Sequence, residues 1–133
     1  MPVASQPQRF RVLRQRAASF GHAFRGVRLA LASELHLRFH AVATVAVVAL
    51  GFYCRLERWE WALVALAVGA VWSAELLNTA VEAIVDLVSP QHHPLAGRAK
   101  DVAAGAVLVV ALAALVVGLL IFGPRLWQLW ARP

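Results

Sequence analysis

Cysteine, lysine and glycine-rich phosphate loops are scarce or missing in this chain of 133 residues. The single cysteine, Cys54, excludes an intramolecular disulfide and any metal site built from cysteine thiolates. Neither G-x-x-x-x-G-K-[ST] nor G-x-G-x-x-G occurs, which excludes the usual glycine-rich cradles for nucleotide phosphates. The N-terminus also lacks a short apolar stretch followed by a small-residue cleavage site, so we expect no signal peptide.

The composition is instead strongly apolar and basic. Hydrophobic residues make up 61% of the chain and the mean hydropathy is +0.67, which favours a membrane protein over a soluble one. The net charge of +6 comes almost entirely from arginines at the chain ends and between apolar runs. This distribution fits a membrane surface rather than a nucleic-acid partner. The length indicates one domain.

The N-terminal third of the sequence predicts a helix that lies on the membrane surface. Residues 1–8 are rich in proline and glutamine, and we expect them to be disordered. Residues 10–37 are amphipathic, with arginines lying off a single apolar stripe. The alternative is a helix packed on a soluble core. The stripe consists of Phe20, Phe24, Val27, Leu31 and Leu35.

Three longer apolar runs predict an all-α protein with three transmembrane helices. We expect these helices over residues 39–55, 59–87 and 98–123. Prolines in the loop that follows the second helix separate it from the third, and Gly123-Pro124 is expected to end the third. Residues 127–133 carry two tryptophans and are predicted to form an interfacial tail.

The arginines also predict an orientation. Three spans place the N-terminus and the loop over residues 88–101 on the same side of the membrane. By the positive-inside rule this side is the cytoplasm, where ATP and Mg²⁺ are present. The arginines before the first span are Arg9, Arg11, Arg14, Arg16, Arg25, Arg28 and Arg38.

A polar stripe interrupts the second span. Glu75, Asn78, Glu82 and Asp86 are spaced i, i+3, i+7 and i+11, which places them within about 80° of one another on a helix. An unpaired charge in a bilayer costs roughly 2.5–3.5 kcal/mol on the mild insertion scale. These carboxylates therefore need shared protons, basic residues or a metal ion as partners.

The types of polar residue present suit the transfer of a phosphoryl group. The only lysine, Lys100, precedes Asp101 near the start of the third span, and lysines and helix N-termini hold phosphates. Mg²⁺ prefers one or two carboxylates together with phosphate oxygens, and Glu34 and Glu82 are candidates. Glu75, the deepest carboxylate, could accept the proton of a hydroxyl nucleophile.

Plainer interpretations of the stripe stay open at this point. Asn78 could only join helices, as asparagines in membranes often do. Glu82 or Asp86 could simply pair with Arg98 or Lys100.

The remaining candidates also have alternatives. Glu34 could be a solvated residue on a helix surface. His92 and His93 could bind a metal, although adjacent histidines point in different directions on most backbones. The stripe could equally belong to a small oligomeric channel or proton-coupled carrier, or to an accessory protein whose polar residues bind helices together.

Three sequence segments carry a resemblance to a known family: FRGVRLALASE, ELLNTAVEAIVDLV and HHPLAGRAKDVAAGAV. They resemble the small prokaryotic diacylglycerol kinases, a family that includes undecaprenol kinase, over residues 14–126. The resemblance implies one lipid kinase domain over residues 9–126, forming an integral membrane homotrimer with active sites shared between subunits. It also implies transfer of phosphate from MgATP to the hydroxyl of a membrane lipid.

The resemblance implies a role for most of the polar residues. Glu75 would be the catalytic base, and Glu34 and Glu82 would bind Mg²⁺. The ATP-binding residues would be His22, Glu34, Glu82, Gln91, His92, His93, Lys100 and Asp101. The substrate-binding residues would be Glu75, Asn78, Arg28 and Ala104, with Asp86 and Arg98 in supporting roles.

Finer features resemble the undecaprenol kinase branch of the family. These are FHAVA after the surface helix, GLLIFGPRL near the end, and His22 where the diacylglycerol kinases usually have tyrosine. The nucleotide-contacting arginine of the family aligns with Gln15, and Arg14 or Arg16 could replace it. The resemblance implies a bacterial plasma membrane protein whose lipid substrate is undecaprenol or diacylglycerol.

Overall fold

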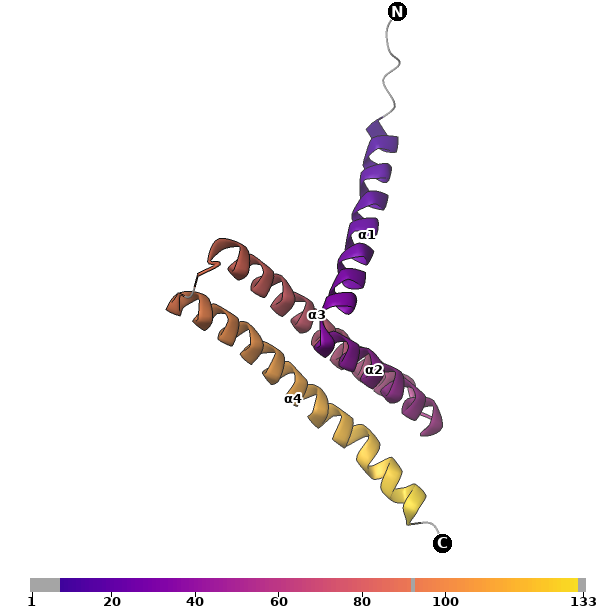
Figure 1. Ribbon diagram of the computed structural model, residues 1–133. Coiled ribbons are helices and arrows are strands. Elements are labelled where there is room, and N and C mark those ends of the chain that lie inside the picture. The colour runs from indigo at the N-terminus through magenta and orange to yellow at the C-terminus, as the bar shows by residue number, and fades with distance from the viewer. Residues whose placement is uncertain (1–7, 92, 132–133) are drawn as a thin grey trace, which may run out of the picture. The chain divides into compact units, whose positions relative to one another are not determined.

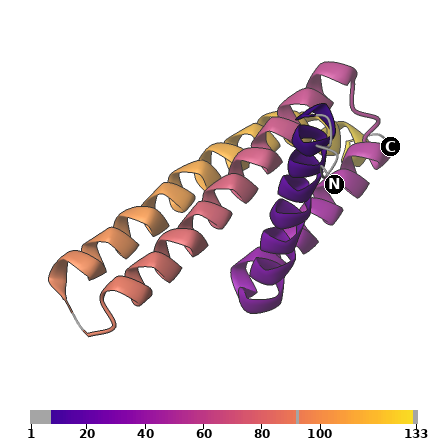
Figure 2. The same ribbon diagram turned by 90° about the horizontal axis from the view of Figure 1, so that it is seen from above.

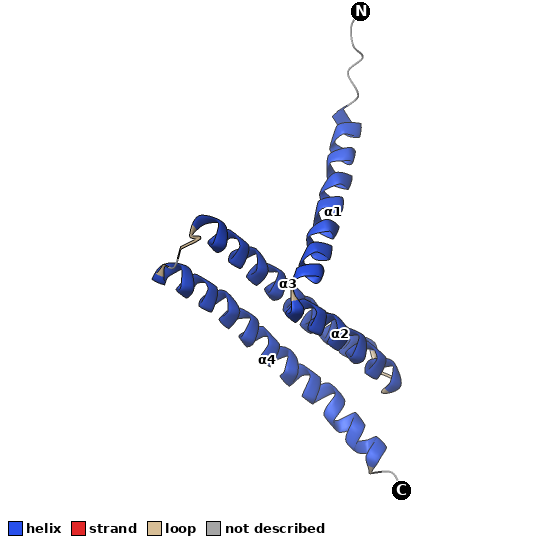
Figure 3. Ribbon diagram, viewed as in Figure 1, coloured by secondary structure: helices blue, strands red, loops and turns tan. Residues whose placement is uncertain are grey.

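The computed structural model describes residues 8–91 and 93–131, and all regular secondary structure within them is helical (Figure 3). The helices are α1 (Gln8–Ser33), α2 (Leu35–Tyr53), α3 (Arg58–Val88) and α4 (Pro94–Trp130). The chain divides after Ser33 into two compact units, of which the first contains α1 and the second contains α2, α3 and α4. The predicted all-α class is confirmed. The segment 1–8 lies outside the described residues except for Gln8.

The helix predicted over residues 10–37 ends earlier, at Ser33. The Ser33 hydroxyl donates to the carbonyls of Leu29 and Ala30, at 3.2 and 3.4 Å, within the last turn of α1. Glu34 then has extended backbone angles, φ −99° and ψ 119°, and a new helix starts at Leu35. The apolar spacing continues through Leu31 and Leu35, so periodicity gives no sign of this break.

Three helices of the second unit are long and apolar enough to cross a membrane, by length and composition. They are Leu35–Tyr53, Arg58–Val88 and the Pro94–Gln128 part of α4. The predicted spans 59–87 and 98–123 fall within the second and third of these helices, whereas the predicted span 39–55 runs two residues past Tyr53, where α2 ends. Most of their apolar side chains are exposed in the single chain, as expected for helices that face lipid or other subunits.

The turn between α2 and α3 is a Schellman motif in which the residue with left-handed backbone angles is an arginine. Arg55 has φ 52°, in the left-handed region where glycine is common. The amide of Arg55 donates to the carbonyl of Phe52, and the amide of Leu56 donates to that of Gly51, both at 3.1 Å. These two bonds satisfy the last carbonyls of α2 and reverse the chain into α3.

A capping box starts α3. The Glu57 side chain accepts from the backbone amide of Glu60, and the Glu60 carboxylate accepts from the amide of Glu57 at 2.7 Å. Glu60 is buried and also forms an ion pair with Arg125 of α4. The Arg125 guanidinium additionally donates to the Cys54 carbonyl at 3.0 Å. We call these residues, Cys54, Glu57, Glu60 and Arg125, the arginine clamp.

The hydrophobic core of the second unit lies beside the arginine clamp. α4 runs next to α3 in the opposite direction (Figures 1 and 2). A β-carbon on Gly51 would come within 2.6 Å of the Trp61 ring, so glycine is needed for the close approach of α2 to α3. The buried core cluster is Cys54, Leu56, Val64, Ile121 and Phe122.

The prediction that Gly123-Pro124 ends the third span is wrong. Pro124 lies inside α4, which continues to Trp130. A proline removes one amide donor, here the one that would bond to the Leu120 carbonyl, but it does not force the chain out of a helix when packing holds both sides. Arg125, directly after the proline, is held by the arginine clamp. Trp127 and Trp130, expected in a tail, are therefore helical.

Candidate active site

The polar stripe lies on the second half of α3, and burial decreases along it. Glu75 is buried, Asn78 and Glu82 are half-buried, and Asp86 is exposed near the end of the helix. This gradient matches a helix whose last turns emerge from the hydrocarbon. Within the stripe, Glu75 is therefore the carboxylate that is best shielded from water.

Glu75 is paired with a histidine on a neighbouring helix. Its Oε1 lies 2.9 Å from Nε2 of His40, which lies near the start of α2. The exposed fractions of the two side chains are 8% for Glu75 and 20% for His40. The backbone carbonyl of Glu75 accepts from the Thr79 hydroxyl at 3.1 Å. The buried carboxylate thus has a polar partner, as such groups require.

Asn78 is hydrogen-bonded to the next acidic residue of the stripe. Its Nδ2 donates to Glu82 Oε1 at 2.8 Å, an i, i+4 bond within α3. Its Oδ1 is buried and has no hydrogen-bond partner among the described residues. In the single chain Asn78 therefore does not join two helices, and it holds an acceptor that a ligand could satisfy.

The expected pairing of an acidic stripe residue with the lysine is present. Lys100 Nζ lies 2.6 Å from Asp86 Oδ1 and joins the end of α3 to the start of α4. The exposed fractions are 37% for Lys100 and 66% for Asp86, so the ammonium remains accessible to an anionic ligand. Arg98 and Asp101 are exposed on the same first turns of α4.

The loop between α3 and α4 brings further predicted residues to this end. His93 is the N-cap of α4, and its Nδ1 accepts from the Leu95 amide at 3.2 Å. The carbonyl of Gln91 accepts from the Ser89 hydroxyl at 3.1 Å. Ala104 is exposed on α4, and His92 lies outside the described residues.

Three other predicted residues lie on α1 and at the start of α2. Glu34 is half-buried at the N-terminus of α2, and its side chain makes no capping hydrogen bond. His22 and Arg28 are exposed on α1, which belongs to the other unit. Their roles stay predictions.

No three histidine, cysteine or acidic side chains gather into a metal site within the described part of the chain. Mg²⁺ does not need such a cage, because it is commonly held by one or two carboxylates, waters and the phosphates of a substrate. Glu82 engages one carboxylate oxygen with Asn78, an arrangement that fits such a shared site.

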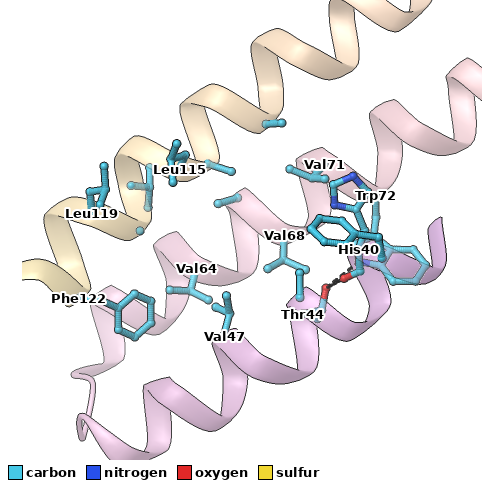
Figure 4. Close-up of a pocket in the computed structure, with 17 residues that line it drawn as sticks. His40, Thr44, Val47, Val64, Val68, Val71, Trp72, Leu115, Leu119 and Phe122 are labelled. Carbon is cyan, nitrogen blue, oxygen red and sulfur yellow. Dashed lines mark hydrogen bonds between the residues drawn. The ribbon is translucent and has the colours of Figure 1, made fainter. Parts of the chain in front are cut away.

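An apolar cavity lies between α2, α3 and α4 (Figure 4). Its volume is about 490 Å³, and its walls are mostly valine, alanine, leucine and phenylalanine. His40, Thr44 and Trp72 form its polar lining (Figure 4). The imidazole that contacts Glu75 therefore also borders a space suited to a hydrocarbon chain.

Two polar contacts between distant residues were not predicted from the sequence. His40 pairs with Glu75 across 35 residues, and Arg125 pairs with Glu60 across 65. Neither pair belongs to a local spacing pattern. An isolated histidine in an apolar run, such as His40, is the only hint that such a partner is needed.

The fold and this site define a small helical membrane protein with a carboxylate-rich site at one end of its spans. The profile of the prokaryotic diacylglycerol kinases matches residues 21–122. The chain therefore belongs to the prokaryotic diacylglycerol kinase family, and it is a membrane lipid kinase, as predicted. This membership favours the kinase interpretation of the stripe over the carrier and the accessory protein.

Individual relatives place the chain within the family. It is 49% identical to an undecaprenol kinase of Bacillus subtilis, over 81% of this chain and 88% of the relative. It is 41% identical to a diacylglycerol kinase of Synechocystis, over 96% and 75% of the two chains. A diacylglycerol kinase of Escherichia coli is 32% identical, over 72% and 79%. The predicted likeness to the undecaprenol kinase branch is thus confirmed.

Proposed function

We propose that this lipid kinase transfers the γ-phosphate of MgATP to the hydroxyl of undecaprenol in a bacterial plasma membrane. The observation that carries the proposal is the buried Glu75 carboxylate, joined through His40 to an apolar cavity between the spans. Such a site offers a proton acceptor to a hydroxyl at the end of a hydrocarbon chain. The higher identity to an undecaprenol kinase than to the two diacylglycerol kinases supports the choice of lipid.

Glu75 acts as the general base in this proposal. The lipid hydroxyl loses its proton to the Glu75 carboxylate as its oxygen bonds to the γ-phosphorus. The bond between that phosphorus and the β–γ bridging oxygen breaks, and ADP leaves with the bonding electrons. General-base catalysis contributes typically about 10²–10⁴-fold to the rate.

The exposed end of the stripe holds the nucleotide. Lys100 and Asp101 contact ATP, with the Lys100 ammonium on the phosphates, and Glu34 and Glu82 carry Mg²⁺. Bound Mg²⁺ neutralises charge on the phosphate oxygens. The exposure of Lys100 and of its partner Asp86 supports this role, because a solvent-exposed ion pair exchanges partners at little cost.

Asn78 lies between the proposed base, Glu75, and the proposed Mg²⁺ ligand, Glu82, on α3. Its amide nitrogen holds Glu82, and its unpartnered Oδ1 can accept from the lipid hydroxyl or from a bound water. Gln91, His92 and His93 contact ATP, Ala104 contacts the lipid, and Arg98 has a supporting role. His22 is proposed to bind ATP, and Arg28 is proposed to bind the lipid substrate.

The assembled enzyme is proposed to be a homotrimer with its active sites on the cytoplasmic side. The widely exposed apolar faces of α2, α3 and α4 support association within the membrane. The excess of arginine before the first span supports the orientation.

The test is a transfer assay with purified protein in lipid micelles, ATP and Mg²⁺. Undecaprenol and diacylglycerol are offered in separate reactions, and radiolabelled phosphate is measured in the lipid fraction. Transfer to undecaprenol alone, or with a much higher kcat/KM, is the expected result. Preferred transfer to diacylglycerol would overturn the choice of lipid, and transfer to neither would overturn the proposed reaction.

A further inference from the structure

The Glu75 carboxylate makes one side-chain hydrogen bond among the described residues, and its partner lies on another helix. His40 of α2 places Nε2 at 2.9 Å from Glu75 Oε1. In its proposed role as base, Glu75 starts the reaction ionised, and an ionised carboxylate can only accept hydrogen bonds, so Nε2 of His40 is the donor in that state. The bond occupies Oε1 and leaves the second oxygen, Oε2, for a substrate.

His40 is itself held in place. The Thr44 hydroxyl donates to the His40 carbonyl at 2.7 Å and accepts from the Trp72 indole at 3.0 Å. Trp72 lies one turn before Glu75 on α3. Two polar bridges therefore join α2 to α3 one turn apart, Trp72 to Thr44 and Glu75 to His40.

From this geometry we infer that His40 is a positioning residue for Glu75. This inference rests on the proposed role of Glu75 as the base. The Nε2–H of His40 fixes the rotation of the carboxylate so that Oε2 is presented to the lipid hydroxyl. The same hydrogen bond is kept after Oε2 has taken the proton, because Oε1 is still an acceptor in the neutral acid.

The surroundings of His40 give this bond its importance. The imidazole lines the apolar cavity, where few other groups can hydrogen-bond to a carboxylate. Without His40, Glu75 would lose its only described side-chain partner while remaining buried. A buried carboxylate in that state turns toward whatever donor is nearest, and misplacing a reacting group by about 1 Å can cost about 10²-fold in rate.

The test compares His40→Leu and His40→Gln with His36→Gln, a matched change of an exposed histidine one turn earlier on the same helix. His40→Leu should lower kcat by about 10²-fold while KM for ATP and lipid changes little. His40→Gln, whose amide can still donate, should recover much of kcat. His36→Gln should behave as the parent. A kcat of His40→Leu equal to that of His36→Gln would overturn the inference.

Two further results separate positioning from mere stability. In a Glu75→Gln background, His40→Leu should cause no further loss of the residual rate, because the two residues act as one unit. An additive loss would show that His40 acts elsewhere and would overturn the inference. If His40→Leu does not fold, His40→Met, which also lacks a donor, takes its place: a parental KM with a kcat about 10²-fold below that of His40→Gln supports positioning, and a kcat equal to that of His40→Gln overturns it.

The proposed function and this inference fail in different ways. A Glu75→Gln enzyme with near-parental turnover would remove the base assignment, and the inference with it. An inactive Glu75→Gln enzyme beside a fully active His40→Leu enzyme would leave the base assignment standing and remove only the role of His40.

Discussion

The two ends of the α3–α4 pair differ in how their polar groups are satisfied. At the arginine clamp, the Glu60 carboxylate accepts from the Glu57 amide and from the Arg125 guanidinium, which also caps the end of α2. At the opposite end, Asn78 Oδ1 is buried without a partner among the described residues. The ion pair of Lys100 with Asp86 there is open to solvent.

This difference separates two roles that buried polar groups can have: holding the structure together and binding a ligand. A fully connected network fixes one geometry, and each of its members loses its partner if another is removed. A network with an unsatisfied acceptor and an exposed cation has capacity for a ligand. We therefore expect substitutions at the stripe to change turnover, and substitutions at the clamp to change stability. We expect the effect on turnover to decrease from substitutions of Glu75 through those of Glu82 and Asp86 to those of Arg125.

Glu75→Gln should have the largest effect on turnover, a loss of about 10²–10⁴-fold, because the amide cannot accept the lipid proton. Nucleotide binding, measured by equilibrium titration, should be nearly unchanged. Glu57→Gln removes a carboxylate at the clamp end, keeps an acceptor oxygen for the capping box, and serves as the control. Equal turnover of the two variants would erase the proposed contrast between the ends.

Glu82→Gln should weaken the dependence on Mg²⁺, because one of the two proposed carboxylate ligands is lost. The Mg²⁺ concentration for half-maximal rate should rise severalfold, and saturating Mg²⁺ should restore part of the rate. The bond from Asn78 survives, since glutamine still accepts through Oε1. An unchanged Mg²⁺ titration would contradict the assignment of Glu82.

Asp86→Asn should change turnover only modestly, through the position of Lys100. Both side chains are well exposed, and exposed ion pairs contribute roughly 0–1 kcal/mol to stability. We expect a small shift in KM for ATP and little change in thermal unfolding. A loss of turnover as large as that of Glu75→Gln would show that Asp86 acts directly on the reacting groups.

Arg125→Met should leave turnover per folded molecule nearly unchanged while lowering the thermal midpoint, because it leaves the Glu60 carboxylate buried without its counter-ion. The double variant Glu60→Gln/Arg125→Met should be more stable than Arg125→Met alone. Thermal unfolding in matched micelles gives the comparison. A double variant less stable than both single variants would mean that the clamp is not a charge-compensating unit.

Local patterns in the sequence were sufficient for the helices and the stripe. Apolar length predicted the spans, and the spacing from Glu75 to Asp86 placed four polar residues on one helix face. The break at Glu34 escaped detection because the apolar spacing continues across it. The passage of α4 through Pro124 depends on contacts of Arg125 with distant residues.

The partner of the proposed base could not be found from the sequence for a similar reason. His40 and Glu75 meet only because Gly51 and the left-handed Arg55 allow α2 to fold back closely along α3. No local spacing pattern around His40 or Glu75 indicates that the two side chains are in contact. Similarly, nothing near Glu60 indicates which of the twelve arginines of the chain will neutralise it.

The positions of Glu60, Glu75 and Glu82 along α3 also indicate how deep the proposed base lies in the membrane. At 1.5 Å per residue, Glu75 stands about 22 Å along the axis from Glu60, and Glu82 about 10 Å further. The hydrocarbon layer is about 30 Å thick. With Glu60 near one surface, Glu82 reaches the opposite surface while Glu75 stays below it. With Glu75 as the proposed base, an acceptor alcohol must place its hydroxyl beneath the headgroups, which is easiest for a lipid that carries no other polar group.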